Sequence, residues 1–160
     1  MATHRKGLNM NEFRKNAVIK FREIFRRVNV QYSLFAKAMG INFTAICILE
    51  CLSESDVLIT QKELSEKLVI PKQMVNTVIK SFWEQGYVEL KETTDRRSKL
   101  VILTDTGKEY SAKAIKPLQN VDYVAWGCFT DKEIEMLLEL IGRYEDSFER
   151  AVSEFAESEI

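Results

Sequence analysis

Two helical patterns followed by two alternating patterns occupy residues 60–107, TQKELSEKLVIPKQMVNTVIKSFWEQGYVELKETTDRRSKLVILTDTG. Thr60 and Glu63 have the spacing of a capping box, so a short helix is expected to begin there. After a tight connector, Pro71 suits the first turn of a second helix, where its missing N–H costs nothing. Gly86 then marks the end of that helix. The stretch therefore predicts a helix–turn–helix pair.

A basic β-hairpin is expected directly after this pair. Residues 87–92 and 99–103 alternate as two strands, with the segment between them as the tip. The tip and its exit carry three cationic side chains, Arg96, Arg97 and Lys99. A helix–turn–helix followed by a basic hairpin is the layout of a winged helix–turn–helix.

Long amphipathic helices are expected on both sides of this stretch. Over residues 10–38 apolar side chains recur at steps of three and four, and residues 131–157 show the same pattern. Residues 1–9 are expected to be a flexible arm. The remaining expected elements connect these segments: a helix from Asn42 or Thr44 to about 53–56, a strand at 57–60, and a helix from Thr104 that ends near Lys116–Pro117. The fold class is thus mainly α, with a small antiparallel hairpin as the wing.

The net charge of −1 hides an asymmetry along the chain. Residues 1–59 carry nine basic and five acidic side chains, whereas residues 109–160 carry five basic and twelve acidic ones. A chain divided in this way can offer its positive part to an anion while the acidic part does something else.

The second helix of the pair has one apolar and one polar face. Its apolar positions are Val75, Val78, Ile79 and Phe82. Such a helix can enter the major groove of DNA, where Gln and Asn pair with adenine and Lys reaches guanine or phosphate. The hairpin would then lie beside the backbone or the minor groove, whose negative potential attracts arginine. The expected DNA-binding residues are Lys72, Gln73, Asn76, Thr77, Lys80, Arg96, Arg97 and Lys99.

These residues carry a resemblance to a known family. The segments LITQKELSEKL, PKQMVNTVIKSFWEQGYVEL and TTDRRSKLVILTDTGKEY, within residues 42–110, resemble the MarR family of bacterial transcriptional regulators. The resemblance implies that Asp95 pairs with an arginine and fixes the wing, while Arg96 or Arg97 enters the minor groove. Members often place small hydroxyl residues and an arginine early in the recognition helix, whereas Lys72, Gln73, Met74 and Thr77 stand there in this chain. The operator sequence therefore does not transfer.

The two ends of the chain are suited to forming a homodimer. The first helix is basic, the last is acidic, and each has an apolar stripe. The resemblance implies the same arrangement, with interlocked terminal helices and two recognition helices about one DNA turn, roughly 34 Å, apart on a pseudo-palindrome. The expected division is 10–41 as an N-terminal dimerisation helix, 42–110 as the DNA-binding lobe and 111–160 as C-terminal dimerisation helices.

A small-molecule effector is a further expectation that comes from the resemblance. The resemblance implies a ligand pocket between the dimerisation helices and the DNA-binding lobe. An aromatic crevice there would suit a small aromatic or amphipathic molecule. The alternative is that these aromatic side chains are ordinary core. The candidate lining residues are Tyr32, Phe35, Met39, Tyr123, Trp126 and Phe129.

Rival functions follow from fewer residues. If the winged helix served protein–protein contact, the cationic side chains of the tip would be ordinary solvent-exposed residues without a role in DNA binding. A thiol-based redox sensor would instead use Cys47 and Cys51, which share a helix face but lie among apolar neighbours. No metal site, cofactor or enzymatic activity is expected, because the only histidine, His4, lies in the N-terminal arm. The chain has no apolar run of about 18 residues and no secretory signal, so a cytoplasmic protein without a membrane segment is expected.

Overall fold

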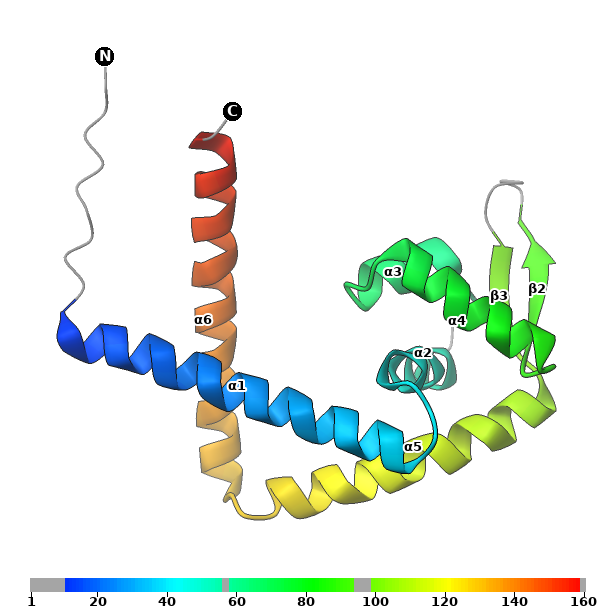
Figure 1. The fold of residues 1–160 in the computed structure, drawn as a ribbon, viewed down its shortest axis with the longest axis horizontal. Coiled ribbons are helices and arrows are strands. Elements are labelled where there is room, and N and C mark those ends of the chain that lie inside the picture. The colour runs from blue at the N-terminus through cyan, green and yellow to red at the C-terminus, as the bar shows by residue number, and fades with distance from the viewer. Residues whose placement is uncertain (1–10, 56–57, 94–98, 159–160) are drawn as a thin grey trace. The chain divides into compact units, whose positions relative to one another are not determined.

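The computed structural model describes residues 11–55, 58–93 and 99–158. The chain forms two compact units, Met1–Lys116 and Pro117–Ile160. The elements are, in order, α1 (Glu12–Ala38), α2 (Phe43–Glu54), β1 (Ile59–Thr60), α3 (Gln61–Lys67), α4 (Lys72–Glu84), β2 (Val88–Glu92), β3 (Lys99–Leu103), α5 (Asp105–Trp126) and α6 (Asp131–Ser158) (Figure 1). This mainly helical fold with a winged helix–turn–helix confirms the predicted fold class.

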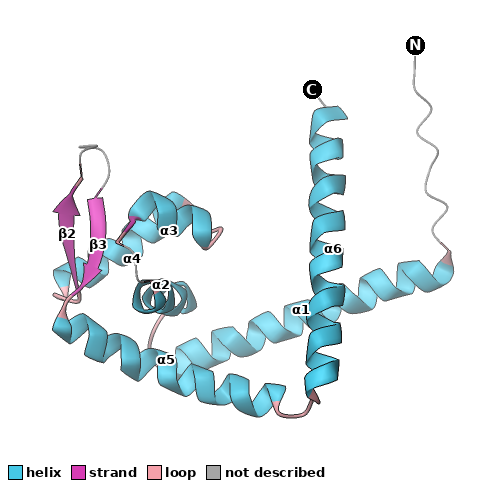
Figure 2. Ribbon diagram, turned by 180° about the vertical axis from the view of Figure 1, so that it is seen from behind, coloured by secondary structure: helices cyan, strands magenta, loops and turns pink. Residues whose placement is uncertain are grey.

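The three strands form one antiparallel sheet in the order β1–β3–β2. β2 and β3 are the predicted hairpin, and they pair from Val88 opposite Leu103 to Glu92 opposite Lys99. Figure 2 shows these two strands side by side. The described part of the predicted strand at 57–60 is two residues of β1, and Ile59 pairs with Val101 of β3.

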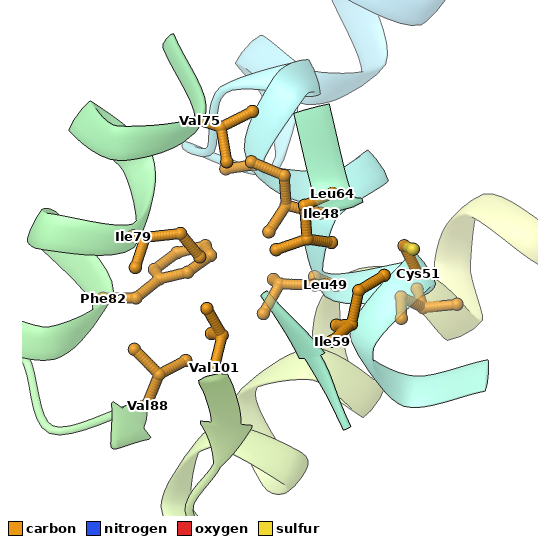
Figure 3. Packing of buried hydrophobic residues seen from close by; sticks show 13 residues of the cluster. Ile48, Leu49, Cys51, Ile59, Leu64, Val75, Ile79, Phe82, Val88 and Val101 are labelled. Carbon is orange, nitrogen blue, oxygen red and sulfur yellow. The ribbon is translucent and has the colours of Figure 1, made fainter. Parts of the chain in front are cut away.

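The hydrophobic core of the first unit lies between α2, α4 and the sheet. Ile48 and Leu49 of α2 and Ile79 of α4 are fully buried, and Val101 of β3 is 2% exposed. Figure 3 shows side chains from these three elements and from α3 pointing toward one another. The helix–turn–helix pair and the wing are therefore parts of one packed body, which holds α4 in a fixed position.

Local signals in the sequence explain where two of the helices begin. The backbone N–H of Glu63 donates to Thr60 Oγ1 (3.2 Å), and the N–H of Thr60 donates to Glu63 Oε2 (2.7 Å). Thr130 and Glu133 make the same pair of bonds at the start of α6. The bonds from the threonine N–H and hydroxyl lower the pKa of both glutamates. The predicted capping box at Thr60 is thus confirmed, and α6 begins with a second one.

The predicted end of the helix before Pro117 is wrong. α5 continues through Pro117 to Trp126. A proline inside a helix removes one backbone hydrogen bond and costs about 3 kcal/mol. The buried face nevertheless continues across it, from Ala114 and Ile115 to Leu118. Burial of this face outweighs the local preference of the proline.

Long apolar stripes on α1 and α6 remain exposed, each within its own unit. In α1 only Ala36 is buried, although Phe13, Ile24 and Phe25 recur at helical spacing. α6 has no buried residue. Its stripe is spaced by three and four and consists of Ile134, Leu137, Ile141, Tyr144, Phe148, Val152 and Phe155. The chain thus presents more contiguous apolar helix surface than a monomer ordinarily leaves in water.

Candidate nucleic-acid interface

The turn between α3 and α4 sets the direction in which α4 leaves the core. The N–H of Ile70 donates to the carbonyl of Ser65 (3.1 Å), and the N–H of Val69 donates to the carbonyl of Glu66 (3.3 Å). These two bonds form a Schellman motif, in which the residue after the helix end takes a left-handed conformation. Val69 accordingly has φ of 52°. A β-branched residue in this region is strained, so the fold imposes this turn against the preference of the side chain.

Replacing Val69 by glycine should relieve this strain. The side chain is 89% exposed, so its removal costs almost no packing. We expect Val69→Gly to raise the free energy of unfolding by about 1 kcal/mol, measured by urea denaturation. The control Glu66→Gly, within α3, should lower it by about 1 kcal/mol. A loss of stability in Val69→Gly would show that the turn is not strained.

α4 has the two faces that its sequence predicts. Val75 and Ile79 are fully buried and Phe82 is 4% exposed, so one side of the helix packs into the core. The five polar residues singled out for DNA contact are all exposed: Lys72, Gln73, Asn76, Thr77 and Lys80. The helix of 13 residues is about 20 Å long. Its dimensions and polar surface suit a major groove about 12 Å wide.

Hydrogen bonds and charges modify this exposed face. Thr77 Oγ1 donates to the carbonyl of Gln73 (2.9 Å), which leaves the threonine methyl group for apolar contact. Lys80 Nζ lies 3.7 Å from Glu84 Oε1, and both side chains are more than half exposed. Such a surface pair is weak, so Lys80 can exchange the carboxylate for a phosphate. Glu84 and Trp83 were not predicted from the sequence as surface residues of this helix, and Trp83, at the same end, is 56% exposed.

The strands of the wing are described, but its tip is not. Lys99 is exposed at the start of β3, opposite Glu92. Asp95, Arg96 and Arg97, to which the sequence analysis assigned the wing contacts, lie outside the described residues. Their roles therefore stay predictions.

The base of the wing is held by residues from three elements. Gly86, after α4, has φ of +74°, and the N–H of Tyr87 donates to the carbonyl of Phe82 (2.8 Å). The hydroxyl of Thr104 donates to the carbonyl of Gly86 (2.7 Å) and accepts from the N–H of Gly107 (3.0 Å). The end of α4, both strands of the wing and the start of α5 are thereby tied together. These bonds explain why Gly86, Thr104 and Gly107 stand at their positions in the motif that resembles the family.

Aromatic rings pack beside this junction. Tyr87 and Tyr110 stack with centroids 4.2 Å apart and an interplanar angle of 9°. Phe82 meets each of them edge-on, at 6.2 and 6.3 Å. Burial raises the pKa of Tyr110, and the neighbouring Tyr87 adds to the effect. The cluster couples the recognition helix to α5 within the first unit.

Gly107 leaves no room for a side chain at this junction. A Cβ at this position would lie 1.9 Å from the carbonyl oxygen of Tyr87, which is backbone and cannot rotate away. We expect Gly107→Ala to lower the free energy of unfolding by about 2–3 kcal/mol, measured by urea denaturation. The matched control is Gly142→Ala in α6, where no atom lies within 4 Å. That change should raise stability by about 0.5–1 kcal/mol. Equal effects of the two substitutions would contradict the close packing.

The six residues predicted to line an effector pocket fall into the two units. Tyr32, Phe35 and Met39 belong to the first unit, where the ring of Tyr32 lies 5.0 Å from that of Phe43. The other three belong to the second unit: Tyr123, Trp126 and Phe129. Tyr123 and Trp126 line an open groove of about 440 Å³ within that unit, together with Gln119, Asp122, Ile134 and Leu138. These last four were not predicted from the sequence, although the α5 members have helical spacing.

The three cysteines differ in exposure. Cys51 is buried and Cys47 is half-buried. Burial raises the pKa of the Cys47 thiol, and the Glu50 carboxylate adds to this, so little reactive thiolate forms at neutral pH. Cys128 is exposed and donates to the carbonyl of Ala125 (3.1 Å). The raised pKa disfavours the redox-sensing alternative at Cys47.

The described residues contain neither a metal-binding cluster nor a single helix that could span a membrane. Within 11–55, 58–93 and 99–158, no group of three or more His, Cys, Asp or Glu side chains could hold a metal ion. In the same part of the chain, no single helix is both long and apolar enough to cross a membrane. Only the bent pair of α1 and α2 meets the length and composition criteria together.

The exposed polar face of α4, the two strands of the wing and the packed base between them define a winged helix–turn–helix protein. Residues 39–98 match the model of the MarR family. NMB1585, a MarR family regulator from Neisseria meningitidis, has 30% sequence identity over 84% of this chain and 97% of its own, with a TM-score of 0.68. The chain therefore belongs to the MarR family, whose members are transcription regulators and not enzymes.

More distant structures share the fold. AbsC, a MarR family transcriptional regulator from Streptomyces coelicolor, has 17% identity over 88% of this chain and 97% of its own, with a TM-score of 0.74. The PcaV transcriptional regulator from the same organism, solved in complex with its natural ligand, has 17% identity over 91% of this chain and 98% of its own, with a TM-score of 0.67. No curated protein matches the chain.

Proposed function

We propose that the protein is a sequence-specific DNA-binding repressor that binds a pseudo-palindromic operator as a homodimer. The exposed polar face of α4, on a helix whose other face packs into the core, is the observation that supports this most. A rigid helix that presents amide and ammonium groups at the surface can read base edges without a large ordering cost.

The chemistry of α4 assigns a role to each exposed side chain. Gln73 and Asn76 carry amides that can pair bidentately with adenine N6 and N7. Lys72 and Lys80 reach guanine or phosphate oxygens. The methyl group of Thr77 suits the methyl group of thymine, since its hydroxyl is already bonded to the helix backbone.

The wing would contact the flanking DNA. In this proposal Arg96 or Arg97 enters the minor groove, Lys99 neutralises a phosphate, and Asp95 holds the loop through an arginine. Arginine is drawn to a narrow minor groove because its negative potential is enhanced. The packed base around Thr104 and Gly107 would transmit the position of α4 to the wing.

A dimer would cover the apolar stripes that a single chain leaves exposed. α1 carries seven basic and two acidic side chains, whereas α6 carries nine acidic and three basic ones. Two copies can therefore bring oppositely charged helices together, which like-charged helices would resist. In this division residues 10–41 and 111–160 form the dimer and residues 42–110 bind DNA. A small aromatic or amphipathic ligand would release the repressor, with Tyr123 and Trp126 among its contacts.

Substitutions on α4 test whether the helix reads bases. Gln73→Ala and Asn76→Ala should each cost about 1–3 kcal/mol of binding free energy, and only at particular base pairs of the operator. Fluorescence anisotropy with operator variants measures this. The matched control is Gln85→Ala, an exposed glutamine at the far end of the same helix, which should change affinity at no position. A uniform loss across all sequences would mean that Gln73 and Asn76 contact phosphates.

The salt dependence of binding separates a DNA reader from a module for protein contact. Each phosphate neutralised contributes about −0.9 to the slope of log K against log salt concentration. A repressor dimer should give a steep, linear plot. Weak binding that ignores salt would favour the protein-contact function.

A further inference from the structure

Val69 stands in the turn between α3 and α4 with a backbone conformation that its side chain disfavours. Its φ is 52°, and the turn bonds donated by the N–H groups of Val69 and Ile70 hold it there. A β-branched residue with positive φ is strained, whereas glycine takes the same conformation without steric cost. Strained residues are concentrated at positions where function requires their side chains.

The side chain of Val69 contributes almost nothing to the packing of the chain. It is 89% exposed, more than any other large hydrophobic side chain among the described residues. The turn itself is closed by the backbone bonds and by Ser65 Oγ, which donates to the carbonyl of Ile70 (2.7 Å). The fold therefore uses the backbone of Val69 but not its two methyl groups, so a contact that uses them has to come from outside the chain.

The position of the turn favours DNA as the partner of this side chain. Pro71, two residues after Val69, is the N-cap of α4, and Lys72 and Gln73 follow as exposed residues of the first helical turn. In a helix–turn–helix, the N-terminal residues of the recognition helix contact the base edges. Val69 thus precedes the end of α4 that enters the groove in the proposed function. The turn belongs to neither of the segments assigned to the dimer.

The chemistry of the side chain selects one group on DNA. Val69 offers no donor, acceptor or charge, so it cannot bond a phosphate or the polar edge of a base. The 5-methyl group of thymine is the apolar group that base edges display in the major groove. The turn bonds fix the backbone, and a β-branched side chain has few rotamers, so little conformational freedom is lost when the contact forms.

We propose that Val69 is a specificity-determining residue, whose methyl groups pack against the 5-methyl group of one thymine in each half-site of the operator. The assignment rests on the proposed function and deepens it, because it names one base of the operator and the residue that reads it. It also gives the strained turn a purpose: the side chain that costs stability is the one that makes the contact.

Deoxyuridine tests this contact, because it differs from thymidine only in lacking the 5-methyl group. The probe is the duplex that in vitro selection recovers with the full-length protein, with each thymine replaced in turn. Fluorescence anisotropy should reveal one thymine per half-site whose replacement weakens binding of the unsubstituted protein about fivefold. In Val69→Gly and Val69→Ala the same replacement should change affinity by less than about twofold, since the methyl groups that read it are gone.

The choice of variants separates the side chain from the backbone strain. Val69→Gly relieves the strain, whereas Val69→Ala keeps most of it, since alanine also disfavours positive φ. Equal losses of thymine discrimination in both, with higher stability only in Val69→Gly, would assign the effect to the methyl groups. Val69→Ile keeps a β-branched apolar side chain and should retain the discrimination. The control Leu58→Ala shortens an aliphatic side chain that is 56% exposed elsewhere in the first unit, and it should leave binding within about twofold.

The outcomes distinguish this contact from its rivals. A loss confined to Val69→Gly would show that the strained turn positions α4 and that the side chain reads nothing. A thymine effect that persists in both variants would assign the reading to another apolar group, such as the methyl group of Thr77. Either result, or a duplex in which no thymine is sensitive to replacement, overturns the assignment and leaves the repressor in place. A selection that enriches no sequence would refute the repressor, and with it any reading of an operator by Val69.

Discussion

Ile141→Glu combined with Phe148→Glu is expected to convert the dimer into a monomer and to weaken operator binding about 1,000-fold. Both side chains belong to the exposed stripe of α6, at 46% and 53% exposure. Burying such a side chain contributes about 1.5–3 kcal/mol. Each side chain is about half exposed and a twofold dimer contains each residue twice, so the substitutions remove about 3–6 kcal/mol before the cost of burying four carboxylates is added. A monomer binds only one half-site of the operator at a time, and the loss of simultaneous binding to both half-sites accounts for the fall in DNA affinity.

Analytical ultracentrifugation and anisotropy measure the two effects. Because neither side chain is buried in a single chain, the substitutions should leave the circular dichroism spectrum unchanged. Arg150→Glu introduces the same residue on the opposite side of α6 and should leave the dimer intact. An unaltered dimer after the double substitution would show that the stripe is not the interface.

Arg96→Ala combined with Arg97→Ala is expected to weaken binding to all DNA sequences about 100-fold at physiological salt. Each wing arginine that meets a phosphate or the minor groove releases counterions. A dimer has two wings, each with one or two arginines on the DNA, so the slope of log K against log salt concentration should become shallower by about 2–4.

The control for this prediction is a double substitution that removes the same number of positive charges from another part of the chain. Lys132→Ala combined with Arg150→Ala removes two cations from α6, outside the helix–turn–helix and the wing, and should leave both affinity and slope unchanged. An unchanged slope in the arginine variant would refute the role of the wing. A loss confined to particular base pairs would instead make these arginines base readers.

The helix–turn–helix and the wing could be predicted because their signals are local. The capping box of Thr60, the terminating Gly86 and the alternation of β2 and β3 each act within a few residues. The two faces of α4 follow from periodicity alone, and the buried Val75 and Ile79 confirm them. The core therefore forms where the local preferences and the apolar pattern agree.

The remaining features depend on contacts between distant residues. Pro117 is a local stop signal, but the buried face of α5 continues past it to Leu118. The left-handed Val69 has no sequence signal, because the turn bonds impose it. Asp122 could not be recognised as a groove residue before α6 was known to pack beside it. Tertiary packing overrides local preference in each case.

In vitro selection of bound DNA with the purified protein tests the central claim, that the exposed face of α4 lies in the major groove. The proposal predicts enrichment of a pseudo-palindrome whose half-site centres are about 10 base pairs apart. It also predicts that Gln73→Ala relaxes the selection at the same positions of both half-sites. Selection that enriches no sequence, or a motif that Gln73→Ala and Asn76→Ala leave unchanged, would contradict it.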